Sequence, residues 1–294
     1  MPYGLTLIQS QLFARIPYPT SDFTGQTVIV TGSNTGLGLE AARHLVRLGA
    51  KVVLGVRTLS KGEAAAADIV RTCDTSADRV AVWQLNMSDH DSIKAFAERA
   101  STLDRLDAVI LNAGVLSMKW SEIGGVESHI AVNVIGTVLL ELLLLPTLQR
   151  SAKTTGQPGR MTVVGSDLMY VAQPEDLQTE GPVLEKLNTK GEIDIGSYYR
   201  LSKLLVFYAN RRIADEHPVS NQSNVIMTVV TPGACVSDIF RDDMALAQRV
   251  GMAIGMKLLA RTTEVGGRTL VNAIKPKMDP GAHGKFVMDC IVTV

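Results

Sequence analysis

The sequence predicts an α/β protein built on a doubly wound parallel sheet of about seven strands, with helices on both faces of the sheet. Three observations lead to this fold class. Short β-branched runs alternate with stretches of helical spacing from residue 26 onward, the early runs are apolar at nearly every position, and a glycine-rich turn joins the first run to the first helical stretch. Strands that are apolar throughout suit a sheet that is buried on both faces.

The elements follow one another in a regular order. The expected strands are Thr27–Thr31, Val52–Val56, Val80–Leu85, Ala108–Leu111, Met161–Val164, Val225–Val230 and Lys285–Val287. The expected helices are Leu39–Leu48, Ser60–Arg71, Asp91–Ala100, Gly125–Gln149, Ser197–His217 and Thr263–Ile274. Runs of β-branched residues indicate strands, and apolar residues three and four apart indicate helices with one buried face. Since no repeat or low-complexity linker interrupts this order, we expect a single domain over residues 25–294.

Three segments depart from the alternation. Residues 1–24 precede the first strand, and we expect them to form an arm or short helix on the outside of the domain. Residues 167–196 and 234–262 are expected to be substrate loops, the second of them a mobile helical lid rich in alanine and methionine. Long loops at the carboxyl ends of parallel strands are usually functional, because ligands bind at that edge of the sheet.

Composition excludes several classes of protein. Hydrophobic residues make up 46% of the 294 residues and charged residues 20%, which excludes a disordered or fibrous chain. Lys and Arg number 29, as do Asp and Glu, and aromatic residues are only 5%, so the features of a nucleic-acid-binding protein are missing. Cys73, Cys235 and Cys290 are far apart and odd in number. We therefore expect no disulfide framework, no metal site and a reducing, cytoplasmic location.

The sequence also argues against a signal peptide and a membrane-spanning segment. Near the amino terminus no basic segment precedes a continuous apolar run, so a cleaved signal peptide is not expected. The most apolar stretch, Val132–Leu148, contains Asn133 and Glu141 and is shorter than the roughly 20 residues that span a bilayer. We therefore expect no integral membrane segment.

A glycine-rich turn follows the first expected strand. Its members are Gly32, Ser33, Asn34, Gly36, Leu37 and Gly38, and a helix follows directly. A tight strand-to-helix turn needs backbone angles that glycine adopts freely, and a phosphate group can approach the main-chain N–H groups only where no Cβ intervenes. Between a strand and a helix, this pattern predicts the pyrophosphate turn of a dinucleotide-binding Rossmann domain.

The end of the second expected strand bears on which dinucleotide binds. Proteins that bind NAD usually carry an acidic residue there, which accepts a hydrogen bond from the ribose 2′-hydroxyl. This chain has Val56 followed by Arg57 instead. A guanidinium can pair with a 2′-phosphate, so we favour NADP(H) over NAD(H). The alternative is that Arg57 is a solvated surface arginine.

Tyr199 and Lys203 are the candidate catalytic pair. They lie four residues apart, on one face of the expected helix. A free tyrosine has a pKa of about 10, and a neighbouring ammonium favours the phenolate, so we expect Lys203 to lower the pKa of Tyr199. Tyr198 is a poorer candidate, because Ser202, the residue four positions on, carries no charge.

Two further polar residues stand at informative positions. Ser166 follows the fifth expected strand, which places its hydroxyl at the carboxyl edge of the sheet. Asn133 lies among apolar residues of the long helix after the fourth strand, where a buried amide needs hydrogen-bond partners. Alternatively, Asn133 is a structural amide of the core whose hydrogen bonds are all made within the protein.

With these residues in place, the chain resembles the short-chain dehydrogenases/reductases, in their compact single-domain branch. The matching motifs are Thr31-Gly-x-x-x-Gly36-x-Gly38, Asn112-Ala113-Gly114, Asn133, Ser166, Tyr199-x-x-x-Lys203 and Pro232-Gly233, in the family's order. They cover nearly the whole chain from Phe23 to Val287. Arg57 and the long interval between Ser166 and Tyr199 are similar to the retinol-dehydrogenase-like subgroup and its fungal relatives.

The resemblance implies a role for each matched residue. Tyr199 is expected to exchange a proton with a carbonyl or alcohol oxygen, and Lys203 to hold the nicotinamide ribose. Ser166 is expected to orient the substrate oxygen, and Asn133 to anchor a water molecule of a proton relay behind Lys203. The remaining expected cofactor contacts are Leu37 at the pyrophosphate turn, Asn112, Ala113 and Gly114 on the adenosine side, and Pro232 and Gly233 beside the nicotinamide.

Two positions depart from the family pattern. Where the family usually has Asp and an apolar residue to hold the adenine amino group, this chain has Asn86 and Met87, whose amide oxygen can still accept that hydrogen bond. Where a threonine commonly follows Pro232-Gly233, Ser237 is the nearest match and can bond the carboxamide.

The resemblance implies an NADPH-dependent carbonyl reductase, reversible as an alcohol dehydrogenase, which acts through a Ser-Tyr-Lys-Asn set. Two alternatives stay open: a cofactor-binding sensor or regulator without turnover, and a non-reductive step of biosynthesis on the same fold. Apolar residues of the two loops suggest a bulky, mainly apolar carbonyl or alcohol substrate of secondary metabolism, although each could instead pack in the core or lid. They are Leu168, Met169, Tyr170, Met244, Met252, Met256 and Leu259. The apolar surface of helices Gly125–Gln149 and Ser197–His217 suggests a homodimer, as in relatives.

Overall fold

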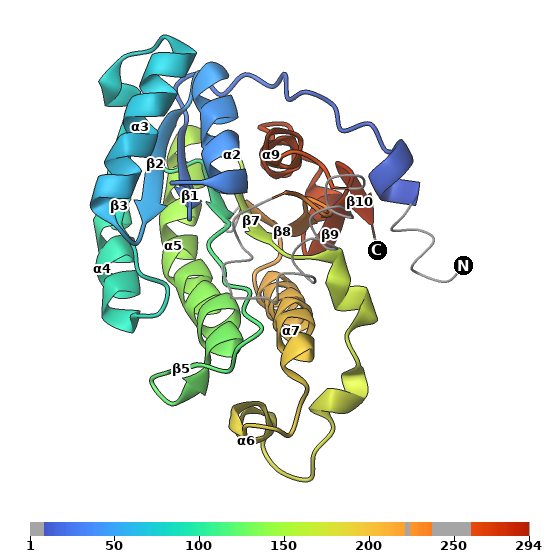
Figure 1. Ribbon diagram of the computed structural model, residues 1–294. Helices are drawn as coiled ribbons and strands as arrows, with labels where there is room; N and C mark the ends of the chain where they lie inside the picture. Colours follow the sequence, from blue (N-terminus) through green and yellow to red (C-terminus); the bar gives the residue numbers. More distant parts are fainter. Residues whose placement is uncertain (1–8, 221–223, 237–259, 294) are drawn as a thin grey trace.

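The computed structural model describes residues 9–220, 224–236 and 260–293. At its centre the described residues form an eight-stranded sheet in the order β10-β9-β8-β7-β4-β1-β2-β3 (Figure 1). Each strand is parallel to its neighbours except β10, which is antiparallel to β9. The strands of this sheet are β1 (Thr27–Thr31), β2 (Lys51–Val56), β3 (Val80–Gln84), β4 (Ala108–Leu111), β7 (Gly159–Val164), β8 (Val225–Thr231), β9 (Lys285–Met288) and β10 (Ile291–Thr293). The predicted doubly wound α/β fold is confirmed.

Helices cover both faces of the sheet because successive strand residues point to opposite sides. In β1, Val28 and Val30 pack against one group of helices and Ile29 against the other, and all three side chains are fully buried. One group comprises α2 (Gly36–Arg47), α3 (Leu59–Cys73) and α9 (Thr263–Asn272). The other comprises α4 (His90–Ser101), α5 (Thr137–Thr155) and α7 (Ile195–Glu216). The resulting three layers are visible in Figure 1.

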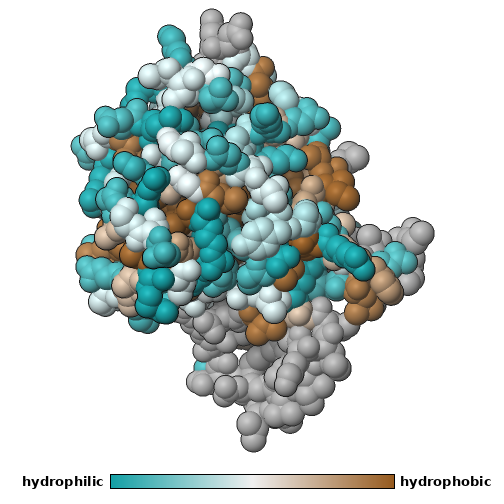
Figure 2. Space-filling view, turned by 90° about the horizontal axis from the view of Figure 1, so that it is seen from above, coloured by the Kyte–Doolittle hydropathy of each residue, from teal (hydrophilic) through white to brown (hydrophobic). Residues whose placement is uncertain are grey.

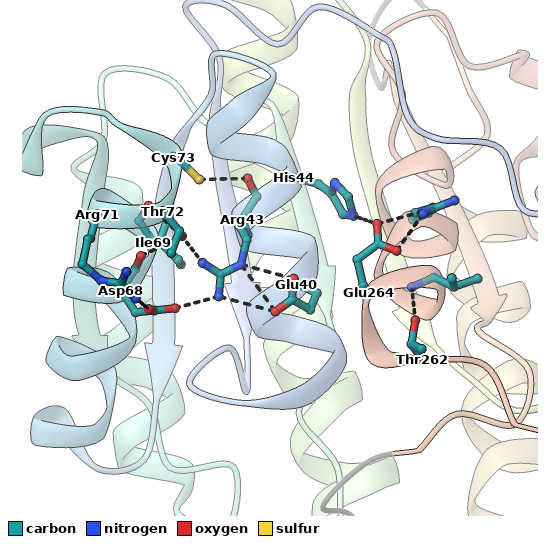
Figure 3. A network of polar contacts seen from close by, with 12 residues as sticks. Glu40, Arg43, His44, Asp68, Ile69, Arg71, Thr72, Cys73, Thr262 and Glu264 are labelled. Atoms are coloured by element: carbon teal, nitrogen blue, oxygen red, sulfur yellow. Dashed lines mark hydrogen bonds and ion pairs between the residues drawn. The ribbon is translucent and has the colours of Figure 1, made fainter. Parts of the chain in front are cut away.

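Polar contacts hold α2 between α3 and α9 (Figure 3). On one side, Arg43 lies 2.8 Å from Asp68 of α3 and 3.2 Å from Glu40 of its own helix. On the other side, Nε2 of His44 lies 3.0 Å from an oxygen of Glu264 in α9. Burial lowers the pKa of His44, and the nearby Glu264 carboxylate opposes that shift. Because α2 begins at the glycine-rich turn, these contacts also fix the position of that turn.

The structure corrects the predicted start of the long helix at Gly125. Residues 122–127 form a hairpin instead, in which β5 (Glu122–Ile123) pairs with β6 (Val126–Glu127). Gly124 and Gly125 make its turn with φ angles of +59° and +79°, which glycine adopts without strain. A π-helical segment, Ile130–Gly136, leads into α5. Apolar spacing alone does not separate these elements from a continuous helix.

Two further differences concern the end of the chain and the first substrate loop. The sheet gains β10, because Asp289 and Cys290 reverse the chain at positive φ angles of 52° and 64°. The segment 167–196, predicted to be a loop, contains three short helices. They are η3 (Asp167–Val171), η4 (Pro174–Leu177) and α6 (Val183–Asn188).

The amino-terminal arm runs along α9, as Figure 1 shows. Residues 9–13 are helical, and the extended chain beyond them accepts hydrogen bonds at the Ile16 and Pro17 carbonyls from Arg268 and Asn272, at 3.3 and 3.5 Å. The predicted lid at 234–262 lies outside the described residues except at its two ends, 234–236 and 260–262.

Within the described residues, one helix, Ile130–Thr155, is long and apolar enough to cross a membrane by length and composition, and its most apolar window has a mean hydropathy of 2.0. It packs on the sheet, and 61% of its most apolar window is buried, as in the core helix of a soluble protein. Hydrophilic residues predominate on the face shown in Figure 2, with apolar residues scattered among them.

Candidate active site

The predicted cofactor residues converge at the carboxyl edge of the sheet, where the strand order reverses beside β1. A cavity of about 490 Å³ opens there. The predicted residues that line this cavity are Gly32, Asn34, Gly36, Leu37, Arg57, Asn86, Met87, Asn112, Ala113 and Gly114. These residues come from four separate segments, which only the parallel sheet brings together.

The geometry of the glycine-rich turn fits a phosphate group. Gly32 and Gly36 have φ angles of +63° and +61°, so both positions favour glycine. A Cβ on Gly32 would lie 2.9 Å from Cα of Ala113, which shows how closely the two strand ends approach. A Cβ on Gly36 would meet no described atom within 4 Å and would stand in the open space in front of the turn. That space, at the amino end of α2, suits an anion.

Two predicted members of the turn lie behind the cavity wall. The Ser33 hydroxyl is fully buried and donates to the Val30 carbonyl at 2.7 Å. A Cβ on Gly38 would lie 2.5 Å from Nδ2 of Asn112, which itself donates to the Thr31 carbonyl at 2.9 Å. These contacts shape the turn from inside the protein.

At the end of β2, Arg57 is exposed and lines the cavity. Among the described residues that line this cavity there is no Asp or Glu, and Arg57 is the single charged residue. Asn86 is already engaged, because its Oδ1 accepts hydrogen bonds from the Ser88 hydroxyl at 2.7 Å and the Ser88 N–H at 3.3 Å. Ser88 therefore belongs to this wall as much as Asn86 does.

Lys203 and Tyr199 lie one turn apart on α7, as their spacing predicts. The Lys203 ammonium donates to the Val164 carbonyl at the end of β7, at 2.7 Å, and its Nζ lies 5.6 Å from the centre of the Tyr199 ring. Burial lowers the pKa of Lys203 to about 8. Ser166 lies near enough to the Tyr199 phenol to lower its pKa, so the structure places these three residues at one edge of the sheet.

The pKa of Tyr199 shifts in the direction opposite to the prediction. Burial is the largest cause of the rise, Ser166 opposes it and the charge of Asp167 adds to it, and together they bring the pKa to about 12. The cost of burying a phenolate thus exceeds any benefit from Lys203, whose ammonium is directed at a carbonyl oxygen.

Tyr198 points away from this group. It is fully buried, and its ring packs edge-on against Trp120 at a centroid distance of 5.5 Å. Burial raises the pKa of Tyr198 to about 12 as well. The structure therefore gives the adjacent tyrosines, Tyr198 and Tyr199, different surroundings.

Asn133 is held between two segments of the chain. Its Oδ1 accepts from the Val115 N–H at 2.8 Å, and its Nδ2 donates to the Val115 carbonyl at 2.9 Å and to the Ser202 hydroxyl at 3.1 Å. A Cβ on Gly114 would lie 3.1 Å from Oδ1 of Asn133 and 3.8 Å from Nζ of Lys203. Gly114, which lines the cavity, therefore also lies next to the side chains of Asn133 and Lys203.

Pro232 and Gly233 form the turn after β8 and do not line the cavity. The Pro232 carbonyl accepts a hydrogen bond from Arg261 at 3.2 Å, and the Gly233 N–H donates to the Thr231 hydroxyl at 3.1 Å. Ser237 lies outside the described residues, as do the predicted substrate contacts Met244, Met252, Met256 and Leu259. Of the other predicted substrate contacts, Leu168 and Tyr170 are exposed, whereas Met169 is buried in the core.

Eleven further residues that line the cavity were not predicted from the sequence. The missed residues are Thr35, Gly55, Leu85, Ser88, Val115, Leu116, Ser117, Ser121, Ile123, Ser128 and Val132. Several of them belong to the hairpin at 122–127 and its flanks. The paired glycines Gly124 and Gly125 were the available signal for that hairpin.

Comparison with known proteins shows the family to which this chain belongs. A sequence model of the short chain dehydrogenase family matches residues 26–174. The short chain dehydrogenase/reductase dmxR8 from Cryptosporiopsis sp. is 39% identical over 288 residues, which cover 96% of this chain and 87% of that protein. The family model and this relative identify the class as NAD(P)-dependent oxidoreductases. Within that class, the chain belongs to the short-chain dehydrogenase/reductase family.

Solved structures show the same fold. A 3-ketoacyl-(acyl-carrier-protein) reductase from Brucella melitensis, complexed with NADH, aligns with a TM-score of 0.64 at 19% identity, over 91% of this chain and 97% of that one. A proposed NAD(P)-dependent gluconate 5-dehydrogenase from Beutenbergia cavernae, with NADP bound at low occupancy, aligns with a TM-score of 0.66 at 19% identity, over 92% and 97%.

Proposed function

We propose that the protein is an NADPH-dependent carbonyl reductase, reversible as an alcohol dehydrogenase, that acts on a bulky, mainly apolar carbonyl or alcohol. One observation carries the proposal: Tyr199, Lys203 and Ser166 meet at the carboxyl edge of the sheet, beside the Gly114 wall of the cavity. Reduced nicotinamide, when bound, supplies the hydride. The chain supplies the position of the two reactants and the proton.

Tyr199 is the proton donor in this proposal. Because burial raises the pKa of Tyr199 to about 12, its phenol carries the proton that carbonyl reduction consumes. Ser166 orients the substrate oxygen toward that phenol. Lys203 holds the nicotinamide ribose hydroxyls, and Asn133 anchors a water molecule that returns a proton by way of Lys203.

Arg57 supports the preference for NADP(H). A 2′-phosphate would be attracted to the exposed guanidinium at the end of β2, and none of the described lining residues carries a carboxylate that would repel it. The expected cofactor contacts are the predicted residues that line the cavity, with Tyr199, Lys203, Pro232, Gly233 and Ser237. Ser33 and Gly38 contribute by holding the shape of the turn from behind.

The remaining features of the proposal concern substrate, assembly and location. Exposed Leu168 and Tyr170 beside Ser166 suit a largely apolar substrate, as in secondary metabolism.

Exposed Leu142 on α5 and Tyr208 on α7 support a homodimer, which light scattering tests. A cytoplasmic location fits the free thiols of Cys73, Cys235 and Cys290.

The test is turnover of a panel of carbonyl compounds with NADPH. Tyr199→Phe should lower kcat at least about 100-fold for any accepted substrate, because the proton donor is lost. Tyr198→Phe is the matched control and should retain turnover. Activity in Tyr199→Phe would show that the assigned acid is wrong.

Two other outcomes would favour different functions on the same fold. NADPH binding without turnover of any carbonyl, together with a partner whose affinity changes with cofactor, would indicate a sensor or regulator. Product formation without consumption of NADPH would indicate a non-reductive step.

A further inference from the structure

Glu127 and His129 form a buried pair beside the site that the proposed mechanism does not use. Both side chains are fully buried, and Nδ1 of His129 lies 2.8 Å from Oε1 of Glu127. Glu127 ends β6, and His129 directly precedes the π-helical segment that carries Asn133. Ionisable groups are costly to bury unless their hydrogen bonds are made within the protein, so the partners of this pair indicate what it holds in place.

We propose that His129 is a positioning residue of this site: oriented by Glu127, it holds the Tyr199 ring and the cavity wall at residues 115–117 in fixed places relative to each other. The inference rests on the proposed function for its meaning in catalysis. Three sets of contacts carry it.

The first set of contacts fixes the carboxylate of Glu127. Its Oε2 accepts from the His129 N–H at 2.8 Å and from the Ile130 N–H at 3.2 Å, at the start of the π-helical segment. Its Oε1 accepts from the Ser128 hydroxyl at 3.0 Å and faces Nδ1 of His129. Both oxygens of the carboxylate are therefore acceptors in place, and one of them is available for a proton on the imidazole.

The second set of contacts fixes the imidazole of His129. The N–H of Ser117, which lines the cavity, donates to Nε2 of His129 at 3.0 Å. Since Nε2 is the acceptor in this bond, the ring proton lies on Nδ1 and is donated to Glu127. His129 is thus held at both ring nitrogens, by the cavity wall on one side and by Glu127 on the other, so the plane of its ring is fixed.

Asn133 makes the same kind of contact four residues further along the chain. The Val115 N–H donates to Oδ1 of Asn133 at 2.8 Å, as the Ser117 N–H donates to His129. Two residues of the wall that are two positions apart thus meet two side chains that are four positions apart. Val115, Leu116 and Ser117 all line the cavity, so Asn133 and His129 together fasten one continuous stretch of its wall.

The third set of contacts joins His129 to Tyr199. The two rings pack edge to face, with their centroids 6.3 Å apart and an angle of 73° between their planes. Rings at this separation attract each other in this arrangement. Because the same imidazole is fastened to the cavity wall, it fixes the place of the Tyr199 ring relative to the cavity. Small displacements of a reacting group slow its reaction strongly, so this contact matters for catalysis.

Two NMR measurements test these contacts and need no substrate. In protein whose histidines are labelled with nitrogen-15, His129→Gln assigns the His129 signals, which should show a proton on Nδ1 and none on Nε2. His283 gives the contrast in the same spectrum, because its Nδ1 accepts from the Met227 N–H at 3.1 Å and its Nε2 faces the Ala214 carbonyl at 3.0 Å. Its proton should therefore lie on Nε2. A nuclear Overhauser effect should join the rings of His129 and Tyr199.

Turnover and cofactor binding then divide the two contacts of the imidazole. His129→Gln removes the ring, but its amide oxygen can take the place of Nε2 and accept from the Ser117 N–H. It should lower kcat about 10-fold or more and change the Kd for NADPH by less than about twofold. His129→Ala removes both contacts and should lower kcat and also raise that Kd roughly 3- to 10-fold. A loss of stability alone would not separate kcat from Kd in this way.

The matched control is His283→Gln. It replaces a histidine that likewise accepts from one backbone N–H and faces a second oxygen, but near the amino edge of the sheet, away from the cavity. It should cost stability in urea and leave both kcat and the Kd for NADPH unchanged. Should His129→Gln fail to fold, Glu127→Gln places an amide N–H₂ against donors that now face an oxygen, and it should disturb the His129 signals and lower kcat.

The outcomes separate this inference from the proposed function. A proton on Nε2 of His129, or no Overhauser effect between its ring and that of Tyr199, would overturn the inference whatever the turnover. If both contacts are found but the unmodified protein reduces no carbonyl, the holding role of His129 stands and the proposed function fails. If carbonyls are reduced and His129→Gln keeps the kcat of the unmodified protein, the inference alone is refuted.

Discussion

Asn133 and Val115 form a reciprocal pair of hydrogen bonds. The side-chain carbonyl of Asn133 accepts from the Val115 N–H at 2.8 Å, and its amide nitrogen donates to the Val115 carbonyl at 2.9 Å. Val115 lines the cavity, whereas Asn133 is 2% exposed in the helical segment before α5. The pair thus fastens one wall of the cavity to the core and fixes the orientation of the amide.

Asn133→Ala should reduce both stability and activity. The substitution removes the three hydrogen bonds of the Asn133 amide, to the Val115 N–H, the Val115 carbonyl and the Ser202 hydroxyl, and each such bond contributes about 0.5–1.5 kcal/mol. We expect the free energy of unfolding to fall by about 2–4 kcal/mol, as measured by urea denaturation, and kcat of the folded protein to fall as well.

Thr137→Val is the control for Asn133→Ala. It removes another buried hydrogen bond, from Thr137 to the Val132 carbonyl at 3.1 Å, but does not touch Val115. It should cost stability without lowering kcat. If Asn133→Ala behaves in the same way, Asn133 is a structural amide only.

The strands could be predicted closely from the sequence because their signal is local. β1 and β4 have the predicted bounds, Thr27–Thr31 and Ala108–Leu111, since each is a short apolar run that ends at a turn. The glycine-rich turn and the pair Tyr199 and Lys203 were found for the same reason: their spacing lies within one turn or one helix face.

The parts that could not be predicted depend on contacts between distant residues. The hairpin at 122–127 is held partly by the Glu127 N–H, which donates to Asn188 at 3.1 Å, a residue 61 positions away. The direction of the Tyr199 pKa shift likewise depends on burial and on Asp167, whose proximity to Tyr199 exists only in the folded chain. Neither the helical spacing nor the position of Lys203 in the sequence indicates the hairpin or the direction of this pKa shift.

Arg57→Ala should weaken the binding of NADPH selectively. Loss of a charge-assisted contact with the 2′-phosphate costs about 1.5–3 kcal/mol, which corresponds to a rise in Kd of roughly 10- to 150-fold. The Kd for NADH should not change, because NADH lacks that phosphate. Isothermal titration with both cofactors gives the comparison.

Lys51→Ala is the control for Arg57→Ala, since Lys51 is exposed at the opposite end of the same strand. It should alter neither Kd. An equal loss of NADH and NADPH affinity in Arg57→Ala would mean that Arg57 does not read the 2′-phosphate.

Glu141 should make stability depend on pH. Its side chain is fully buried between α5 and α7 beside Asn210, and burial raises its pKa from 4.5 to about 8. Between these two values the folded protein binds a proton that the unfolded chain has released, so the free energy of unfolding falls as the pH rises through this window. The decrease from this one group should reach about 3–5 kcal/mol above pH 8.

Urea denaturation at pH 5 and pH 9 tests the role of Glu141. Glu141→Gln cannot ionise, so it should gain stability relative to the unmodified protein as the pH rises. Glu216→Gln, on the exposed surface of α7, should show no such gain. Parallel pH curves for the unmodified protein and Glu141→Gln would contradict the assignment.

Gly36→Ala should separate cofactor binding from folding. Gly36 has a φ angle of +61°, so alanine there costs about 1–2 kcal/mol of backbone strain. Its Cβ would meet no described atom within 4 Å, so the protein should still fold. The same Cβ would occupy the space proposed for the pyrophosphate, and the Kd for NADPH should therefore rise at least about 10-fold.

Gly25→Ala is the matched control for Gly36→Ala. Gly25 has a φ angle of +75° and equally open surroundings, but it precedes β1 and does not line the cavity. Both variants should lose similar stability in urea, because the strain is alike, yet only Gly36→Ala should lose affinity for NADPH. If the two variants bind NADPH equally well, the open space in front of α2 does not hold the phosphates, and the cofactor must lie elsewhere along this edge of the sheet.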